Sequence, residues 1–556
     1  MHRPAAASPL ALALAGTLAV SLGGCTVGPN FHSPGWAAPA SWFAGKAAPA
    51  HKVPSEPVAA PVRVAWWGLF NDPELMRLER QVAADNLDVQ TATMRLAESR
   101  AQLGMTGAAR YPVFNANGTY QRQKSSNYGQ LAPIASLSSG GSGAPGTVAG
   151  GANTPVNFKP FDLYQDGFDA SWQPDIWGQV RRSMEAAHAT VRASANARRG
   201  VLLIALSEVA RDYIVLRGTQ EQLRIARENL QTARQGLKLT QDQAAAGVTT
   251  DLDVANASAQ VSITAAQIPS LEQQEQQEMN ALALLLGRPP GALAAELATP
   301  RPVPPVPPRI PVGFPSELLR RRPDIREAEA KLHAATANVG VAVASFYPSI
   351  TLSASFGFQA LQFGNLWKWD ARQYDAGPGI TIPIFQGGLL KYTLVLRKAQ
   401  QKEAAIAYAK TVLSAWHEVD DALIAYRDEQ RRRAALIQAV AENRKALVLS
   451  QSRYKEGVAD FLSVLDAERS LLSAQEQLAV STTTVSTNLV ALYKALGGGW
   501  QNSFPTAAPD VPAAGTGAAI TRVSLPAPAS PAPASPAPAV ASPAGQTPAS
   551  AAATKS

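Results

Sequence analysis

The segment Arg453–Val458 (RYKEGV), followed by Ala459–Arg469 (ADFLSVLDAER), decides how the chain folds. It interrupts a long helical pattern at a single glycine, Gly457. A glycine inside a helix costs roughly 1 kcal/mol relative to alanine unless it ends the helix or turns it. We therefore interpret Gly457 as the tip at which a long helix reverses direction.

The same segment has a second copy 210 residues earlier in the chain. The residues Gly457, Val458, Leu462, Val464 and Ala467 correspond at this offset to Gly247, Val248, Leu252, Val254 and Ala257. The offset also relates Gly388 to Gly178 and Gly497 to Gly287. A constant, ungapped offset over about 110 residues indicates an internal duplication rather than a coincidence of two exposed glycines. Gly247 is then the tip of an equivalent first hairpin.

The composition argues against an enzyme and against a nucleic-acid-binding protein. The chain has 556 residues, 17% charged side chains and a net charge of +8, with basic and acidic residues alternating along helical patterns. Such alternation is typical of solvated helix faces. The single cysteine excludes a disulfide framework, and the six histidines lack the spacing of metal ligands. Since no Walker loop, GxSxG or HExxH motif occurs, we expect no catalytic residue, metal or cofactor.

The N-terminus has the pattern of a secretory signal peptide over residues 1–24, with a basic residue, an apolar run and then small residues. Leu22–Cys25 (LGGC) has the spacing of a lipoprotein box, in which the cysteine becomes the lipidated first residue of the mature chain. Because Cys25 is the only cysteine, we predict lipidation there; an ordinary signal peptide that contains a cysteine is the alternative. Residues 25–70 are rich in Pro, Ala and Trp and predict an irregular arm.

The rest of the chain divides at composition changes. Residues 71–287 form the first repeat, which opens with an N-cap and a proline at Asn71–Glu74 and predicts a helix to about residue 110. Residues 288–315 are a proline-dense connector that we expect not to be helical. Residues 316–500 form the second repeat, and the Ala/Pro/Ser composition of residues 501–556 predicts a disordered tail.

Four segments alternate apolar and polar residues with period two, as strands do. They are residues 111–123, 161–172, 350–359 and 374–382. In the first, Phe114 and Tyr120 fall on one face, and Asn115 and Asn117 fall on the other. This pattern fits a soluble sandwich or a membrane barrel with lipid outside and water inside. Because a barrel needs about eight strands, four that span a membrane must be completed by an oligomer.

The helical patterns between these strands and the tips are unusually long. Gly178–Gly247 and Gly388–Gly457 each extend on the order of 100 Å if they are continuous helices. Helices of that length need a coiled-coil partner because they cannot wrap a compact core. We expect return helices from about residues 250 to 286 and 460 to 496.

At this point the chain resembles the TolC-type outer-membrane factors of tripartite efflux pumps, in the OprM/NodT lipoprotein group. The motifs that carry the resemblance are LLRRRPDIR at Leu318–Arg326, PIFQGG at Pro383–Gly388, VLDA at Val464–Ala467 and ALYKALGGGW at Ala491–Trp500. The resemblance covers residues 25 to 500. It implies an α+β membrane protein: a long antiparallel α-helical coiled-coil barrel, plus four transmembrane β-strands per chain that complete a twelve-stranded trimeric β-barrel.

The resemblance also implies a function. The protein would be a passive exit duct for drugs or other small molecules, which an inner-membrane efflux transporter and a periplasmic membrane-fusion adaptor deliver. It would be a homotrimer, lipid-anchored in the outer membrane and extending into the periplasm, with no nucleic-acid partner. Thr26, in place of an aspartate, favours outer-membrane sorting. Neither the exported compound nor the partner pump follows, because the lumen of a duct is generic.

The resemblance further assigns roles at the tips of the two hairpins. The residues that would contact the adaptor are Gly247, Val248, Gly457 and Val458. Tyr454 and Asp253 match a pair that links neighbouring tip helices in the closed state.

A periplasmic gate is implied a few residues beyond the second tip. Leu462, Asp466 and Arg469 match the ring that narrows the entrance in the family. Ser463 occupies a position where some relatives carry a second aspartate, so we do not expect a doubled carboxylate ring. The alternative is that Asp466 only pairs with Arg469 at i, i+3 spacing and has no effect on conductance or ion selectivity.

Two other classes of protein compete with this interpretation. A periplasmic coiled-coil lipoprotein that serves as a spacer would explain the helices and Cys25. It would not explain the four segments in which apolar and polar residues alternate. A periplasmic hydrolase would need a nucleophile with a base, or a metal site, and the sequence offers neither.

Overall fold

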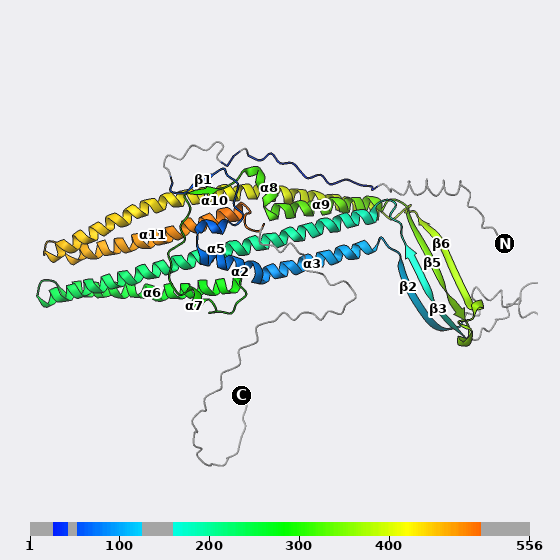
Figure 1. Ribbon diagram of the computed structural model, residues 1–556, viewed down its shortest axis with the longest axis horizontal. Coiled ribbons are helices and arrows are strands. Elements are labelled where there is room, and N and C mark those ends of the chain that lie inside the picture. Colours follow the sequence, from blue (N-terminus) through cyan, green and yellow to red (C-terminus); the bar gives the residue numbers. More distant parts are fainter. Residues whose placement is uncertain (1–25, 40, 43–52, 125–159, 502–556) are drawn as a thin grey trace, which may run out of the picture. The chain divides into compact units, whose positions relative to one another are not determined.

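The computed structural model describes residues 26–39, 41–42, 53–124 and 160–501 (Figure 1). All of them belong to one compact unit, residues 1–506. The predictions of a signal peptide over residues 1–24, of lipidation at Cys25 and of a tail beyond Gln501 lie outside the described residues.

The two long hairpins predicted from the sequence are present and follow the 210-residue offset at every boundary. Helices α5 (Gln179–Ala245) and α6 (Asp251–Leu285) form the first, and α10 (Leu389–Lys455) and α11 (Phe461–Ala495) form the second. The long helix has 67 residues and the return helix 35 residues in both copies. The duplication therefore extends from the sequence to the length of each helix.

The single helix predicted up to residue 110 is wrong, because the helix is broken at Asn86. Helix α2 spans Pro73–Asp85 and α3 spans Leu87–Ala108. The Asn86 side chain accepts a hydrogen bond from the Val89 amide at 3.0 Å and donates one to the Leu285 carbonyl at 2.8 Å. Asparagine is a favoured N-cap, so this residue starts a new helix and ties it to the end of α6.

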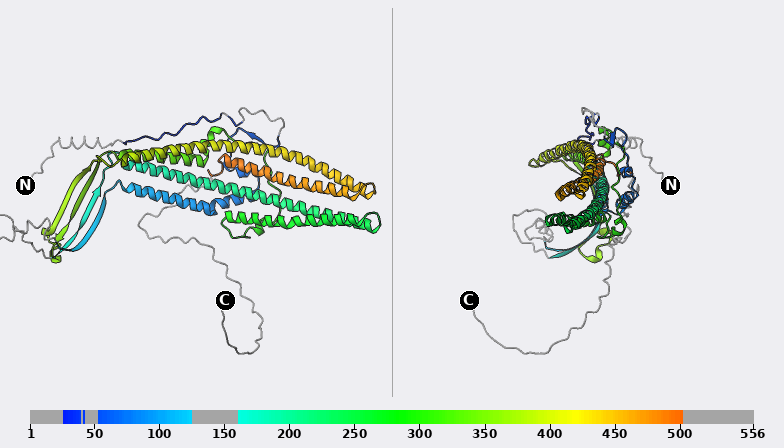
Figure 2. Two further views of the ribbon diagram at one scale, coloured as in Figure 1. Left: turned by 180° about the vertical axis from the view of Figure 1, so that it is seen from behind. Right: turned by 90° about the vertical axis from the view of Figure 1, so that its left-hand side faces the viewer.

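The helices lie side by side in one curved layer (Figures 1 and 2). Near the sheet the order is α3, α5, α9 (Pro323–Ala344) and α10, and towards the tips it is α6, α5, α11 and α10. In both halves α5 and its neighbour α9 or α11 occupy the middle of the layer. Among the described helices, none combines the length and the apolar character needed to cross a membrane.

The arm and the connector contain regular structure that the sequence did not predict. Residues Glu56–Val58 (β1) pair in parallel with Arg309–Pro311 (β4), so an arm expected to be irregular supplies a strand. Gln430 on α10 holds this strand by accepting from the Ser55 amide at 2.9 Å and donating to the Ser55 carbonyl at 3.1 Å. The short helical turns are η1 (Trp66–Phe70), α7 (Ala294–Leu297), η2 (Pro315–Glu317), α8 (Leu318–Arg321), η3 (Phe363–Asn365) and η4 (Trp369–Ala371). Helix α7 lies in the connector, so the prediction that residues 288–315 contain no helix is wrong for these four residues.

The main core lies where the arm meets the ends of both repeats. The ring of Trp66 is fully buried and stacks on Tyr493, with centroids 5.7 Å apart. Its Nε1 donates to the Gly498 carbonyl at 3.1 Å. An aromatic side chain that buries its ring and satisfies its polar atom anchors the arm firmly to α11.

The four predicted strands form one antiparallel sheet in the order β2-β3-β5-β6. Their bounds are Val113–Gln123, Phe161–Trp172, Ser349–Ala360 and Arg372–Thr381. One row of paired residues across the sheet is apolar: Ala116, Phe168, Phe356 and Tyr374. The adjacent row, which points to the other face, is polar: Asn115, Asp169, Ser355 and Asp375. The sheet therefore has an apolar and a polar face, as its period-two pattern predicts.

Candidate functional site

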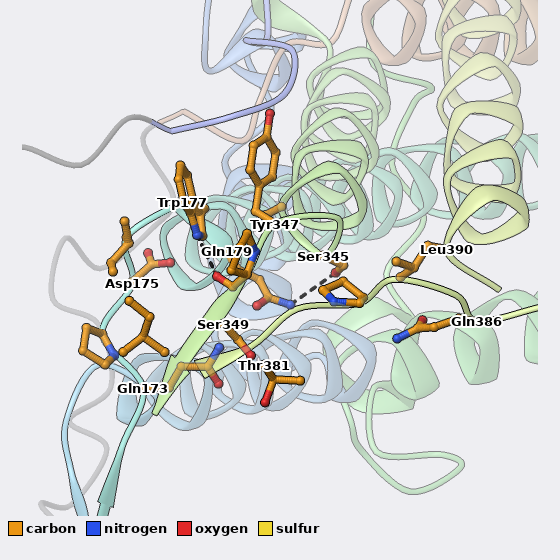
Figure 3. A pocket seen from close by; sticks show the side chains of 16 residues that line it. Gln173, Asp175, Trp177, Gln179, Ser345, Tyr347, Ser349, Thr381, Gln386 and Leu390 are labelled. Atoms are coloured by element: carbon orange, nitrogen blue, oxygen red, sulfur yellow. Dashed lines mark hydrogen bonds between the residues drawn. The ribbon is translucent and has the colours of Figure 1, made fainter. Parts of the chain in front are cut away.

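The strands meet the helices at a junction that contains a cavity of about 310 Å³ (Figure 3). Trp177 Nε1 donates to the Pro348 carbonyl at 2.8 Å, and its ring stacks on Tyr347 at 4.8 Å. Gln179 Nε2 donates to Ser345 Oγ at 3.4 Å. These contacts join the start of α5 to the α9–β5 turn. They fix the two repeats together where the first passes from strand to helix and the second from helix to strand.

The polar groups around this cavity are engaged in holding the backbone. The carboxylate of Asp175 accepts from the amides of Val180 and Arg181 at 3.0 and 2.8 Å, which satisfies donors at the start of α5. The remaining polar lining consists mostly of amides and hydroxyls, among them Gln173, Gln386 and Thr381. The contacts of Asp175 and Trp177 make the cavity a structural joint between the sheet and the helices.

The N-terminal arm is clamped to the same junction by one buried arginine. Arg182 Nε donates to the Val27 carbonyl at 3.1 Å, and its Nη2 donates to the Gly28 carbonyl at 3.2 Å and to Asn30 Oδ1 at 2.8 Å. Its Nη1 pairs with Glu185 at 2.7 Å. Partial burial acts against ionisation of Glu185, but hydrogen bonds from Arg182 and His333 prevail and lower its pKa.

The arm also requires a glycine at its closest approach to the helices. Gly28 has φ +90°, and a Cβ atom there would lie 2.5 Å from the Cα of Gly340 on α9. Two residues earlier, Thr26 lies against Gly178, where a Cβ atom would come within 2.8 Å of the threonine methyl group. Only glycine fits such positions without strain, so Thr26 is fixed beside the start of α5.

Both tips end their long helices with the same glycine motif. Gly247 has φ 75°; its amide donates to the Ala244 carbonyl, and the Val248 amide donates to Gln243, both at 2.9 Å. Gly457 has φ 72° and repeats the pattern one copy later, with Val458 at the following position. These are the hydrogen bonds of a Schellman motif, in which a left-handed residue closes the helix. Val248 and Val458 are 68% and 63% exposed, so each tip has one solvent-exposed valine side chain.

The predicted pair of Tyr454 and Asp253 does not form a hydrogen bond within the described chain. Asp253 belongs to a capping box and accepts from the hydroxyls of Thr249 and Thr250 at 2.6 and 3.1 Å. The hydrogen bond from Thr249 lowers the pKa of Asp253. Tyr454 is buried against Phe461, with ring centroids 5.5 Å apart, and its hydroxyl has no partner among the described residues. A link to a neighbouring chain remains a prediction.

The three predicted gate residues lie exposed on one stretch of α11. Leu462 is 53% exposed, and Asp466 and Arg469 are exposed as well. Arg469 Nε donates to Gln260 Oε1 on α6 at 2.9 Å, and it forms no ion pair with Asp466 within the described residues. The i, i+3 pair of the alternative is therefore absent from the described residues, while the gate itself stays a prediction. The Asp466 carboxylate has no partner in the described part of the chain.

Gln260 is a residue that the sequence did not reveal. It is 6% exposed, and its bond from Arg469 connects the second hairpin to the first. The equivalent residue in the second copy is Ser470, so the duplication gave no signal at this position. A pair contributed by two hairpins becomes apparent only when the helices are placed side by side.

An open sheet with one apolar face, joined to long hairpins with exposed tips, defines a membrane channel with a helical extension. Residues 78–288 and 314–498 match the family described as outer membrane efflux protein, which is more than half of the chain. The chain belongs to the outer membrane efflux protein family. The resemblance stated from the sequence is thereby confirmed.

Individual relatives support the same assignment. The chain is 34% identical over 493 residues to the pyoverdine export outer membrane protein OpmQ of Pseudomonas putida, covering 88% of this chain and 97% of that protein. It is 32% identical over 484 residues to the outer membrane protein OprJ of Pseudomonas aeruginosa, covering 87% and 95%. The solved outer-membrane channel OprN matches with a TM-score of 0.75 and 33% identity, covering 86% and 100%. The chain is an outer-membrane efflux channel, and its family consists of channels rather than enzymes.

Proposed function

We propose that three copies of the chain form one twelve-stranded barrel in the outer membrane, continued by a helical duct in the periplasm. The observation that carries this proposal is the open sheet. Within the described residues, β2 and β6 each pair on one side only, although they are 11 and 10 residues long. Long unpaired edges are unstable in isolation, and pairing β2 of one chain with β6 of the next removes them all.

The two faces of the sheet suit lipid outside and water inside. In the apolar row, Phe168, Phe356 and Tyr374 are 66%, 44% and 77% exposed in the single chain. Exposed aromatic side chains on one face of a sheet are costly in water and favourable in lipid. The opposite face carries Asp169 and Asp375, so it would line a hydrated lumen.

The lipid anchor at Cys25 is part of the same proposal. Thr26, the next residue, is fixed beside Gly178 at the point where strands give way to helices. Acyl chains on Cys25 would then enter the periplasmic leaflet at the base of the barrel, as a second anchor. The lipobox spacing and this fixed neighbour support the assignment together.

We assign the periplasmic end to gating and partner contact. The exposed valines at the tips, with Gly247 and Gly457, would meet the hairpins of a membrane-fusion adaptor. Leu462, Asp466 and Arg469 would surround the pore axis in three copies, and a ring of carboxylates favours cations. Tyr454, whose hydroxyl is unsatisfied in one chain, would reach Asp253 of a neighbouring chain in the closed state.

The duct itself would be passive and would carry small molecules that an inner-membrane transporter and the adaptor deliver. The relatives include a pyoverdine export protein, a toluene efflux pump protein and an antibiotic efflux pump protein. Because these cargoes differ, we propose drugs or other small molecules as the class. In this scheme residues 71–287 and 316–500 are the two repeats, residues 288–315 connect them, residues 25–70 form the lipidated arm and residues 501–556 form a dispensable tail.

The test is the mass of the protein purified from outer membranes in mild detergent. Light scattering corrected for bound detergent should give three chains, and the barrel should resist dissociation until it is heated. A matched variant, Phe168→Arg with Phe356→Arg, places charges on the proposed lipid face at about 2–4 kcal/mol each and should fail to insert. A water-soluble monomer, obtained without detergent, would favour the spacer instead.

A further inference from the structure

Three arginine side chains line a pocket of about 380 Å³ between α5 and α9. Arg192 and Arg199 come from α5, Arg326 comes from α9, and Phe31 of the arm forms another wall. The guanidinium groups of Arg199 and Arg326 lie 4.9 and 5.6 Å from the Trp500 ring. Guanidinium groups are always charged and present forks of donors that match carboxylates. The pocket therefore concentrates donors for an anion.

Within the described residues, the three arginines of this pocket outnumber its one carboxylate. None of the three arginines forms an ion pair with another described residue. Glu329 is the one carboxylate of the lining, and it accepts a hydrogen bond from Ser33 at 2.5 Å. His333 completes the polar lining and is bonded to Glu185 at 2.9 Å.

The arginines also repel one another. Burial, with a further contribution from the nearby charge of Arg326, lowers the pKa of Arg199. The bond that Arg199 does form, to Asn196 Oδ1 at 2.7 Å, brings no negative charge. Like charges held close together are unfavourable, and an anion that binds between them would relieve the repulsion.

The position of the pocket limits what that anion can be. Phe31 belongs to the arm, and Figure 2 shows the arm on the convex side of the curved layer of helices. The pocket therefore lies on the arm's side of the layer, opposite the side that would enclose a lumen and carry an exported solute. Arg192 and Arg199 follow the start of α5 by 13 and 20 residues, or about 20–30 Å along the helix. Lipid headgroups extend only about 5–8 Å beyond the hydrocarbon core, so they do not reach it.

We propose that this pocket binds the carboxylate groups of the peptides that cross-link the bacterial cell wall. This inference rests on the proposed function, because the proposed function places the helices in the periplasm. There the wall is a fixed polymer rich in carboxylates, and the convex side of the duct is the surface it meets. Several weak carboxylate contacts per trimer would add up through multivalency and hold the duct upright in the wall.

The test uses the full trimer in mild detergent and isolated peptidoglycan sacculi, with the bound fraction measured by co-sedimentation. The wild-type trimer should bind the sacculi, and the double variant Arg192→Gln with Arg326→Gln should bind at least about tenfold more weakly. The control is Arg224→Gln with Arg227→Gln, exposed arginines on the same helix that pair with Glu221, Glu228 and Glu272; it should bind as the wild type does.

Two further measurements test whether the pocket arginines and the carboxylates of the sacculi cause the binding. Arg192→Glu alters one exposed residue that has no partner in the described chain, so it should fold normally and still weaken binding. Sacculi whose carboxylates are converted to amides should bind much less of the wild-type trimer. Equal binding by the pocket and control variants, undiminished binding to amidated sacculi, or no binding by the wild type would each overturn the proposal. Failure of the outer-membrane assignment would appear separately, as absence of the protein from outer-membrane fractions.

Discussion

Replacing Arg182 with methionine should release the N-terminal arm from the start of α5 while the helical hairpins stay folded. The arginine is 4% exposed, and three of its hydrogen bonds reach the arm, at Val27, Gly28 and Asn30. Methionine has a similar apolar stem but no donor, so packing against Gly340 is largely kept. The substitution therefore removes the three hydrogen bonds to the arm, together with the ion pair to Glu185 within α5, and keeps most of the hydrophobic contact.

The size of the effect follows from these bonds. A hydrogen bond contributes about 0.5–1.5 kcal/mol net, and a buried acceptor left without a partner costs about 1–3 kcal/mol. Three lost bonds of this kind amount to about 3–5 kcal/mol of local stability. Because 1.4 kcal/mol is a factor of ten, the arm should open about two to four orders of magnitude more often.

Hydrogen exchange measured by mass spectrometry on peptides from residues 26–39 tests this directly. The control is Arg227→Met, which removes an exposed ion pair with Glu272 that is worth at most about 1 kcal/mol. We expect faster exchange in the arm of Arg182→Met and unchanged exchange in α10 and α11. Unchanged exchange in the arm, or equal acceleration at the tips, would refute the assignment of Arg182 as the clamp.

Three other outcomes are expected. Glu79 is buried with neither carboxylate oxygen bonded among the described residues, and burial raises its pKa well above the usual range. The wild type therefore loses stability as the pH rises above the unfolded pKa, so Glu79→Gln should melt higher than the wild type at pH 8, and the gap should close near pH 4. Gly457→Ala should lower the stability of the tip by about 1–2 kcal/mol through its positive φ alone, since nothing lies within 4 Å of the added Cβ. Hydrogen exchange at the tip measures this loss, and an unchanged exchange rate would contradict the left-handed turn at Gly457. Cys25→Ser should abolish palmitate labelling while trimers still insert, whereas labelling that persists would remove the lipoprotein proposal.

The sequence predicted the elements that depend on local or periodic signals. The offset between Gly247 and Gly457 predicts both hairpins with their lengths, because each copy repeats the same helix-ending chemistry. Period-two alternation predicts the four strands, since one face of each must meet a different solvent from the other. The gate residues were assigned by resemblance, and the structure adds that Asp466 is exposed and unpaired within the described chain.

The features that were missed depend on contacts between distant segments. The break at Asn86 depends on the Leu285 carbonyl, 199 residues away, which accepts from its side chain. The pairing of β1 with β4 is held by Gln430, on another helix, in segments whose composition signals irregular chain. Gln260 similarly acquires its role only from Arg469 across two hairpins. No local pattern specifies such partners, because long-range contacts follow from the assembled fold.

The most direct test of the channel and its gate is the current through single trimers in planar lipid bilayers. The wild type should conduct poorly and prefer cations, because in the proposed trimer three Asp466 carboxylates would surround a narrow axis. Asp466→Ala should raise the conductance and weaken the cation preference. The control Glu442→Ala removes an exposed carboxylate on α10 that pairs with Lys445, and it should leave both quantities unchanged. Conductance and selectivity of Asp466→Ala equal to those of the wild type would contradict the gate, and the absence of any current from inserted wild-type trimers, even after the tips are loosened by Gln260→Ala, would contradict the duct itself.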